Sequence, residues 1–239
     1  MERKKYVIVM AAGSGTRMGG DMPKQFLELD GKAILRRSIE VFLAACPDVT
    51  VVTVLQEPFV GIWKNYCLTS GFHCPQVIAK GGITRFHSVR NALAKIPDGA
   101  VVAVHDGVRP LVTPELVRRM FVECEAVPAL VPVVPCVDTM KVLRKENAGD
   151  GAAASLCEVE GARVDRELLY AAQTPQMFHS EVLREAYSQA YDMAFTDDAS
   201  VVSAHGKKLS FTIGERFNIK ITSPDDLVLA EAVVRMRKG

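Results

Sequence analysis

A glycine-rich stretch near the start of the chain combines groups that suit a phosphate. Residues 11–19 read Ala-Ala-Gly-Ser-Gly-Thr-Arg-Met-Gly, and Met-Pro-Lys follows at 22–24. A glycine loop after a buried strand brings backbone N–H groups close to a phosphate. Fixed cations such as Arg17 and Lys24 instead stabilise charge that builds up during phosphoryl or nucleotidyl transfer. We therefore interpret this stretch as the triphosphate-handling half of an active site, with these residues around the phosphates: Ala11, Ala12, Gly13, Ser14, Gly15 and Thr16.

Two better-known phosphate loops do not match this stretch. The dinucleotide pattern G-x-G-x-x-G would need glycine where Met18 stands, and no acidic residue follows about twenty positions later to bind a ribose. The pattern G-x-x-x-x-G-K-[ST] could begin at Gly15, but Asp21 replaces its lysine. A redox enzyme and a P-loop ATPase are therefore disfavoured. A tight turn without a ligand remains an alternative, although such a turn does not need the two cations.

The pattern around this loop predicts an open α/β sheet. Short apolar runs predict buried strands, and amphipathic patterns between them predict helices. The expected strands are 6–10, 49–55, 77–79, 100–104, 129–134, 209–213 and 219–221. The expected helices are 33–45, 60–68, 84–96, 113–127, 180–193, 196–204 and 224–237. This alternation is typical of a twisted, mostly parallel, Rossmann-like sheet with helices on both faces.

Polar clusters follow four of the expected strands. They lie at 11–24, 81–88, 105–110 and 138–141. Open α/β sheets bind ligands beyond the carboxyl ends of their strands, so the four clusters are expected to meet at one edge. Residues 138–166 interrupt the alternation with two ribbon strands and a loose tip, which predicts a β-arm projecting from a single domain that spans 1–239.

The composition is that of an ordinary globular protein. Hydrophobic residues make up 49% of the 239 residues and the formal net charge is +1, so a nucleic-acid partner is not expected. No apolar run approaches the roughly 18 residues that would span a membrane. The basic residues at 1–5 followed by the apolar run 6–12 have the pattern of a minimal signal peptide. A first buried strand explains the same residues, and we therefore expect a cytoplasmic protein. The six cysteines show no C-x-x-C pair and most of them lie inside apolar runs, which predicts buried, reduced thiols.

Eight short motifs occur in a fixed order between residues 11 and 222. They are A-A-G-x-G-x-R-M, P-K-Q, H-D-x-x-R-P, D-T-x-K, V-D-R, Q-T-P-Q-x-F, T-D-D-A-S and N-I-K-I-T. With these motifs the chain resembles the 2-C-methyl-D-erythritol 4-phosphate cytidylyltransferase family over nearly its whole length. The resemblance implies a nucleotidyltransferase that uses CTP and Mg²⁺ to convert methylerythritol phosphate to its CDP-linked form, with release of pyrophosphate. This is a step of the non-mevalonate route to isoprenoids.

The resemblance also implies roles for particular residues. Arg17 and Lys24 correspond to transition-state stabilisers, and Lys220 corresponds to a lysine that places the substrate phosphate and contacts the α-phosphate. Thr139 and Arg166 correspond to arm residues that hold the methylerythritol phosphate of a neighbouring subunit. A homodimer with shared sites is therefore implied, with Arg166 counted among the catalytic residues. The stretch between Thr139 and Arg166 is longer than usual for the family.

Other positions correspond to substrate contacts. Asp106 would bind Mg²⁺ or a substrate hydroxyl, although a turn aspartate is the alternative. Arg109 would lie near the substrate, whereas His105 is expected to be structural. The contacts to cytosine and ribose would come from Gly81, Gly82 and Ser88. Thr174 and Thr196 would lie near the substrate or serve only as turn or cap residues. Ile83 departs from the polar or acidic residue that the family has at this position, which bears on the selectivity for CTP over UTP.

Two alternative functions remain at this point. A ribitol 5-phosphate cytidylyltransferase shares the glycine loop, H-D-x-x-R-P and Q-T-P-Q, but the segments 138–141 and 196–200 favour the first family. A nucleotide-binding protein without catalysis belongs to a different class. The joint presence of Arg17, Lys24 and Lys220 argues against it.

Overall fold

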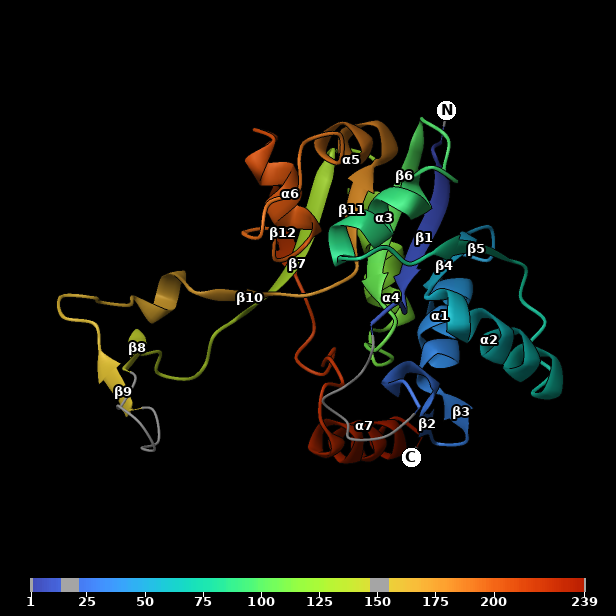
Figure 1. Ribbon diagram of the computed structural model, residues 1–239, viewed down its shortest axis with the longest axis horizontal. Helices are drawn as coiled ribbons and strands as arrows, with labels where there is room; N and C mark the ends of the chain where they lie inside the picture. The colour runs from blue at the N-terminus through green and yellow to red at the C-terminus, as the bar shows by residue number, and fades with distance from the viewer. Residues whose placement is uncertain (1, 14–21, 147–154, 239) are drawn as a thin grey trace.

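A twisted, mostly parallel sheet forms the centre of the molecule (Figure 1). The computed structural model describes residues 2–13, 22–146 and 155–238. In spatial order the sheet contains β10 (Tyr170–Ala172), β7 (Ala129–Pro135), β11 (Gln176–His179), β6 (Ala100–Asp106), β1 (Lys4–Met10), β4 (Thr50–Leu55) and β5 (Gln76–Lys80). A further strand, β12 (Ser210–Ile213), runs parallel to β7. The predicted sheet type is confirmed.

The first strand has parallel neighbours on both sides. In register, Ile8 lies opposite Val52 of β4 and Val104 of β6. Side chains of a strand point alternately to its two faces, and all five residues from Val7 to Ala11 except Met10 are buried. Strands buried on both faces read as continuous apolar runs, which is why the sequence pattern detected this strand. Between β6 and β7, β11 runs antiparallel to both strands.

Helices cover both faces of the sheet. One core contains side chains of α1 (Ile34–Ala45), α2 (Glu57–Thr69) and α4 (Pro114–Glu123). The other contains side chains of α3 (Arg85–Leu93), α5 (Ser180–Ala186) and α6 (Asp198–Ala204). At the bottom of Figure 1, α7 (Pro224–Met236) packs beside the small hairpin of β2 (Glu28–Leu29) and β3 (Lys32–Ala33). These layers leave the carboxyl ends of β1 and β6 free to carry a site.

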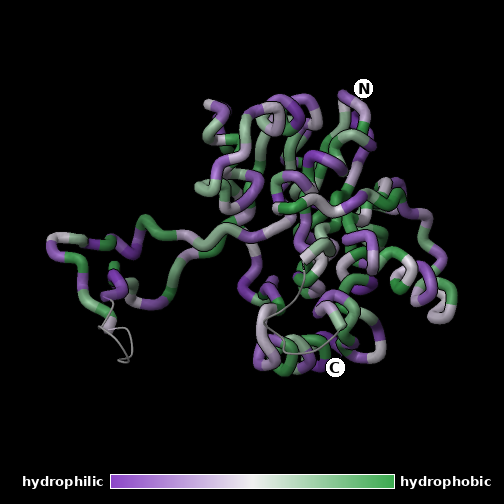
Figure 2. The backbone as a smooth tube through the Cα atoms, in the orientation of Figure 1, coloured by the Kyte–Doolittle hydropathy of each residue, from purple (hydrophilic) through white to green (hydrophobic). Residues whose placement is uncertain are grey.

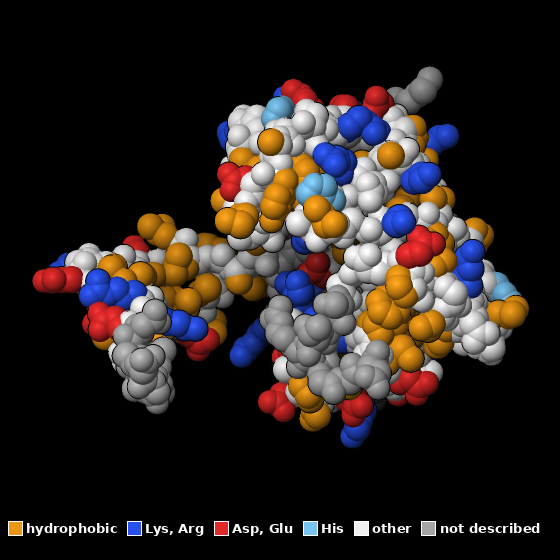
Figure 3. Space-filling view, viewed as in Figure 1, with side chains coloured by type: hydrophobic (Ala, Val, Ile, Leu, Met, Phe, Trp, Pro, Cys, Tyr) orange, Lys and Arg blue, Asp and Glu red, His pale blue; other side chains and the backbone are white. Residues whose placement is uncertain are grey.

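A β-arm extends away from the sheet on the left of Figure 1. Its strands, β8 (Leu143–Glu146) and β9 (Ser155–Glu158), form a separate antiparallel pair. The short 3-10 helix η3 (Arg166–Leu168) leads from the arm back to β10. Hydrophobic stretches of backbone colour the arm in Figure 2, and hydrophobic side chains gather on it in Figure 3. None of the described residues of β8 and β9 belongs to a buried core cluster. The exposed ones on the arm and beside it include Val137, Met140, Leu143, Leu156, Leu168 and Tyr170.

Several boundaries differ from the sequence prediction. The helix expected at 180–193 ends at Ala186, because the Gln189 side chain caps the carbonyl of Ala186 and Tyr187 turns inward to bind Asp198. Such tertiary contacts override helical periodicity. The segment 219–221 forms no strand and instead pairs through Ile221 N–H with the carbonyl of Val108. Four short strands (β2, β3, β10 and β11) were not predicted, since two to four residues give little periodicity.

The thiols are less buried than the apolar runs suggested. Cys46 and Cys124 are buried, whereas the other four cysteines are half-buried, and none of the six is in a disulfide. Burial raises the pKa of the Cys124 thiol to about 12. Within the described residues, no helix has the length and apolar character that crossing a bilayer requires.

Candidate active site

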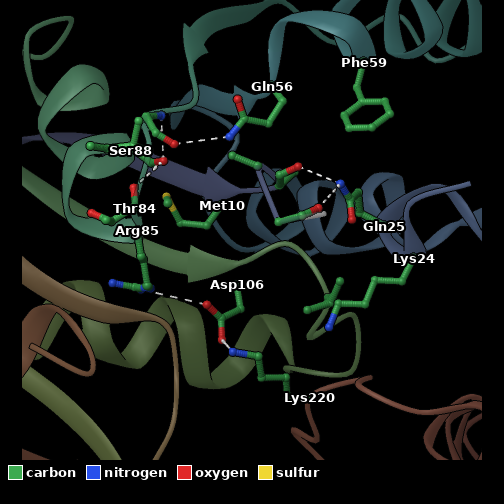
Figure 4. A pocket seen from close by; sticks show the side chains of 16 residues that line it. Met10, Lys24, Gln25, Gln56, Phe59, Thr84, Arg85, Ser88, Asp106 and Lys220 are labelled. Atoms are coloured by element: carbon green, nitrogen blue, oxygen red, sulfur yellow. Dashed lines mark hydrogen bonds and ion pairs between the residues drawn. The ribbon is translucent and has the colours of Figure 1, made fainter. Parts of the chain in front are cut away.

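A pocket of about 540 Å³ opens at the carboxyl ends of β1, β5 and β6 (Figure 4). Three of the four predicted polar clusters line it, and a segment from much later in the chain adds Lys220. Its lining includes Ala11, Ala12, Gly13, Lys24, Gln25, Gln56, Phe59, Gly82, Ile83, Arg85, Ser88, Asp106 and Lys220. The fourth cluster, 138–141, lies on the arm and does not line this pocket.

The start of the glycine loop is held by a buried glutamine. The side-chain amide of Gln25 donates to the carbonyl of Ala11 at 2.7 Å and to that of Gly13 at 3.2 Å. Gln25 is 1% exposed and lies in the 3-10 helix η2 (Lys24–Phe26), so it ties the loop to the same turn that carries Lys24. Sequence reasoning did not assign a role to Gln25, although it belongs to the P-K-Q motif. Its partners are backbone carbonyls, which leave no signature in a sequence.

The second glycine turn is tightly braced. The N–H of Gly82 donates to Ser88 Oγ at 2.9 Å, and the Gln56 amide donates to the carbonyl of Gly82. A Cβ at position 81 would lie 2.7 Å from Ala12 Cβ, and one at position 82 would lie 2.5 Å from His87 Cβ. Glycine is therefore required here by close approach. In this structure Ser88 shapes the turn, which fixes the backbone groups that face the pocket.

The carboxylate of Asp106 is surrounded by cations. Oδ2 lies 3.0 Å from Lys220 Nζ and 3.5 Å from Arg109 Nε, and Oδ1 lies 3.9 Å from Arg85 Nη2. Burial by itself would raise the pKa of Asp106, but the three cations, Arg85 first among them, outweigh burial and hold that pKa well below its usual range. Asp106 is therefore ionised at neutral pH. Figure 4 shows Lys24 reaching toward the side of the pocket on which Asp106 and Lys220 lie.

Behind Asp106, a chain of hydrogen bonds defines the tautomer of His105. The carbonyl of Arg109 can only accept, so His105 Nε2, 3.1 Å away, donates to it. Nδ1 then accepts from the hydroxyl of Thr174, whose oxygen accepts in turn from the N–H of Asp106. Burial lowers the pKa of His105 to about 4, so the ring is neutral. The hydroxyl of Thr174 is thus hydrogen-bonded to both His105 and the backbone of Asp106.

The segment that carries Lys220 is fixed from several sides. Asn218 is fully buried and its amide donates to the carbonyl of Thr174 at 2.8 Å. The guanidinium of Arg109 donates to the carbonyl of Asn218 at 2.7 Å. One turn later, Asp226 accepts from the backbone and hydroxyl of Thr222 and caps α7. The Q-T-P-Q and N-I-K-I-T motifs therefore meet in space, and their contact presents Lys220 to Asp106.

An ion pair at the pocket wall was not predicted. Arg85 lines the pocket from the first turn of α3, and its Nη2 lies 2.6 Å from Oδ2 of Asp198 at the start of α6. Asp198 is fully buried, and its other oxygen accepts from the hydroxyl of Tyr187 at 2.6 Å. The signal available in the sequence was the T-D-D-A-S motif, whose second aspartate is Asp198.

Other predicted residues lie elsewhere. Arg17 and residues 14–16 are outside the described residues. Thr139 and Arg166 are exposed on the arm, where Arg166 donates to the carbonyl of Val137. Thr196 is exposed just before α6, and its N–H donates to Ser200 Oγ. None of these described residues lines the pocket of this chain.

Comparisons with known proteins agree on one family. The model of the 2-C-methyl-D-erythritol 4-phosphate cytidylyltransferase family matches residues 6–236. The enzyme of that name from Phocaeicola vulgatus is 41% identical over 230 residues, which cover 96% of this chain and 99% of that protein. The crystal structure of the Thermus thermophilus enzyme is 31% identical with a TM-score of 0.69, covering 98% and 99% of the two chains. The Francisella tularensis enzyme is 28% identical with a TM-score of 0.74, covering 96% and 99%. The chain belongs to the 2-C-methyl-D-erythritol 4-phosphate cytidylyltransferase family.

Proposed function

We propose that the protein transfers a cytidylyl group from CTP to 2-C-methyl-D-erythritol 4-phosphate and releases pyrophosphate. The observation that carries this proposal is the pocket that residues 11–13, at the start of the glycine loop, line together with Lys24, Lys220 and the carboxylate of Asp106, which pairs with Lys220. A loop that offers backbone donors suits a triphosphate. Two lysines on separate elements suit two phosphate groups that must be brought together against their mutual repulsion.

The reaction needs placement and charge neutralisation more than proton transfer. A phosphate monoester has a second pKa near 6, so at neutral pH it is largely dianionic and can attack the α-phosphorus of CTP directly. The new P–O bond forms in line as the bond to the departing pyrophosphate breaks. Lys220 would hold the attacking phosphate beside the α-phosphate, while Arg17 and Lys24 would stabilise the pentacoordinate centre and the leaving group. His105 is neutral and hydrogen-bonded through both nitrogens, which supports a structural role.

The donor set suits a Mg²⁺ ion that arrives with the nucleotide. Mg²⁺ is commonly held by one or two carboxylates plus substrate phosphates. Asp106 is the only acidic side chain among the described lining residues, and the described residues hold no cluster of three potential metal ligands. Asp106 would therefore share the ion with the phosphates of CTP. When bound, Mg²⁺ would neutralise phosphate charge.

The cytosine and ribose would lie against the second glycine turn, at Gly81, Gly82 and Ser88. Backbone groups dominate there, because Ile83 presents an apolar side chain that is 91% exposed. Selectivity for CTP over UTP would then depend on the backbone of this turn.

The polyol phosphate would lie on the side of the pocket that holds Asp106 and Arg109. Thr174 would support this side from behind through its hydrogen bond with the N–H of Asp106. Thr196 would approach the substrate from the segment before α6, where its side chain is exposed.

We further propose an obligate homodimer of single-domain chains in which the arms complete the sites. Thr139 and Arg166 lie on the arm and not in their own pocket, so they would bind the polyol phosphate of the partner. The exposed apolar side chains of the arm support a covered surface, since a two-stranded ribbon alone is only marginally stable in water. We place the protein in the cytoplasm, where its six free thiols would stay reduced.

One assay tests the function directly. Purified protein is incubated with CTP, Mg²⁺ and either methylerythritol phosphate or ribitol 5-phosphate, and pyrophosphate release is measured. We expect turnover with methylerythritol phosphate and at most a small fraction of it with ribitol 5-phosphate. Preference for the ribitol ester would reassign the substrate. CTP binding without turnover on either substrate would indicate a protein that only binds nucleotide.

A further inference from the structure

The buried ion pair behind the pocket wall points to a positioning function. Arg85 is one of the pocket-lining cations, and its side chain is 32% exposed. Asp198 is inaccessible to solvent and uses both carboxylate oxygens, one for Tyr187 and one for Arg85. Removing an ionised carboxylate from water is costly unless it is paired, so these two contacts account for its charge.

This arrangement fixes one side of the guanidinium and leaves the other toward the pocket. A guanidinium carries five N–H donors in a rigid plane, and Asp198 engages Nη2. Figure 4 shows the Arg85 group directed across the pocket toward Asp106, whose Oδ1 is 3.9 Å away. This separation is again measured from Nη2 and exceeds a hydrogen bond. The Nε and Nη1 donors form no hydrogen bond with the described residues. They are available to a substrate anion.

The α6 terminus that supplies Asp198 is itself anchored to the sheet. Gln176 of β11 donates to Asp197 at 2.7 Å and accepts from the N–H of Ala199 at 2.8 Å. Asp197 also caps α6 through Ser200. The carboxylate of Asp198 is therefore held by a braced helix end, and Arg85 is held by that carboxylate.

We propose that Asp198, assisted by Tyr187, is a positioning residue that aims Arg85 at a phosphate oxygen of the bound substrates. Without it, Arg85 would turn onto Asp106 and compete there with Lys220, so one change would disturb both cations. This inference rests on the proposed function, because it needs phosphate-bearing ligands in the pocket. In this proposal Asp198, the second aspartate of T-D-D-A-S, acts through Arg85 and does not contact the substrate.

A double-mutant cycle tests the inference. The variants are Asp198→Asn, Arg85→Gln and their combination, measured by steady-state kinetics with CTP and methylerythritol phosphate varied in turn. We expect each single variant to lower kcat/KM by on the order of 10- to 100-fold, the value of a hydrogen bond to a charged group. In the Arg85→Gln background, Asp198→Asn should cost less than about twofold more, because its effect passes through Arg85. The substrate whose KM rises is the one whose phosphate Arg85 contacts.

Controls separate positioning from folding. Glu40→Gln removes a half-buried carboxylate that pairs with Arg36 away from the pocket, and it should lower the melting temperature while leaving kcat/KM within about twofold. If Asp198→Asn does not fold, Tyr187→Phe, which retains the carboxylate, replaces it in the same cycle. Equal losses in both backgrounds, or unchanged kcat/KM in Arg85→Gln, would overturn the inference. Calorimetric titration with each substrate measures the same double-mutant cycle as binding free energies and does not need turnover. A wild type that is inactive would therefore count against the proposed function and not against the positioning role.

Discussion

Asp106 and Lys220 form an ion pair inside the pocket, with 3.0 Å between Oδ2 and Nζ. They come from distant parts of the chain: Asp106 ends a central strand, whereas Lys220 lies in an irregular segment before α7. The pair fixes the position of the lysine ammonium group at the pocket wall. A phosphate bound by Lys220, as proposed above, would have to compete with this carboxylate.

Replacing Lys220 by alanine should remove the cation that holds the attacking phosphate. We expect kcat/KM for the polyol phosphate to fall by on the order of 10²–10³, the cost of losing one preorganised charged donor. Initial-rate assays at varied polyol phosphate measure this. Lys207→Ala is the matched control, because Lys207 pairs with Glu185 and does not line the pocket. A similar loss in both variants would contradict a specific role for Lys220.

Replacing Lys24 by alanine should lower kcat by on the order of 10²–10³ with a smaller change in the KM for CTP. The reason is that its charge is expected to act on the transition state more than on the bound nucleotide. Lys32→Ala serves as the control, since Lys32 pairs with Glu40 away from the pocket. Near-normal kcat in Lys24→Ala would refute the proposed stabilisation of the leaving group.

The stability of the protein should decrease as the pH falls from about 6.5 to about 4. The folded state holds His105 at a pKa of about 4, whereas an unfolded histidine titrates near 6.5. The unfolded state binds the extra proton in this window, so acid favours unfolding, by about 3 kcal/mol across the window for this residue. Its contribution is complete above pH 6.5.

Urea unfolding at several pH values checks this for the wild type and His105→Gln. In the variant, the free energy of unfolding should change less steeply with pH, because the histidine no longer contributes to the slope. This comparison of slopes holds whatever the stability of the variant at pH 7. His73→Gln, at an exposed position, should keep the wild-type slope. Parallel slopes for wild type and His105→Gln would show that His105 does not stay neutral in the folded protein.

Shared sites predict complementation between two inactive proteins. Arg166→Ala removes an arm contact, and Lys220→Ala removes a pocket contact. Each homodimer should be nearly inactive, but a heterodimer would contain one site with an intact Lys220 and an intact partner arm. Mixed and re-equilibrated samples should therefore regain activity, measured alongside the fraction of tagged heterodimers. Heterodimers without activity would argue that each chain completes its own site.

Chelation should abolish turnover while leaving the fold intact. We expect EDTA to remove activity and added Mg²⁺ to restore it, since the proposed ion arrives with CTP and is not a buried structural metal. Circular dichroism with and without EDTA should coincide. Thermal unfolding that shifts with EDTA in the absence of nucleotide would indicate a resident metal instead.

The sequence predicted the parts of this protein that local patterns encode. Apolar runs identified β1, β5 and β6, and the polar clusters expected after these three strands line one pocket, whereas the fourth expected cluster lies on the arm. The pairing of Asp106 with Lys220 could not be derived in this way, because no pattern links residues from different elements. Only the family resemblance suggested that Lys220 belonged to the site.

The residues that were missed share a physical reason. Gln25 and Arg85 act through partners that are distant in sequence or that belong to the backbone. On a helix, a charged residue such as Arg85 cannot be told from a solvated one until its buried partner is known. Tyr187 likewise fits the pattern of the expected helix 180–193, but the structure ends that helix at Ala186 and turns Tyr187 to donate to Asp198.

The late position of Lys220 has a consequence for how the protein is made. The parallel core strands β1, β4, β5 and β6 all precede residue 107, so a growing chain can assemble them early. The charge network around Asp106 is complete only after the segment with Lys220 and its anchor on α7 have left the ribosome. A nascent chain that stops before this point would contain the central strands but no competent site, so catalytic activity is among the last properties that translation confers.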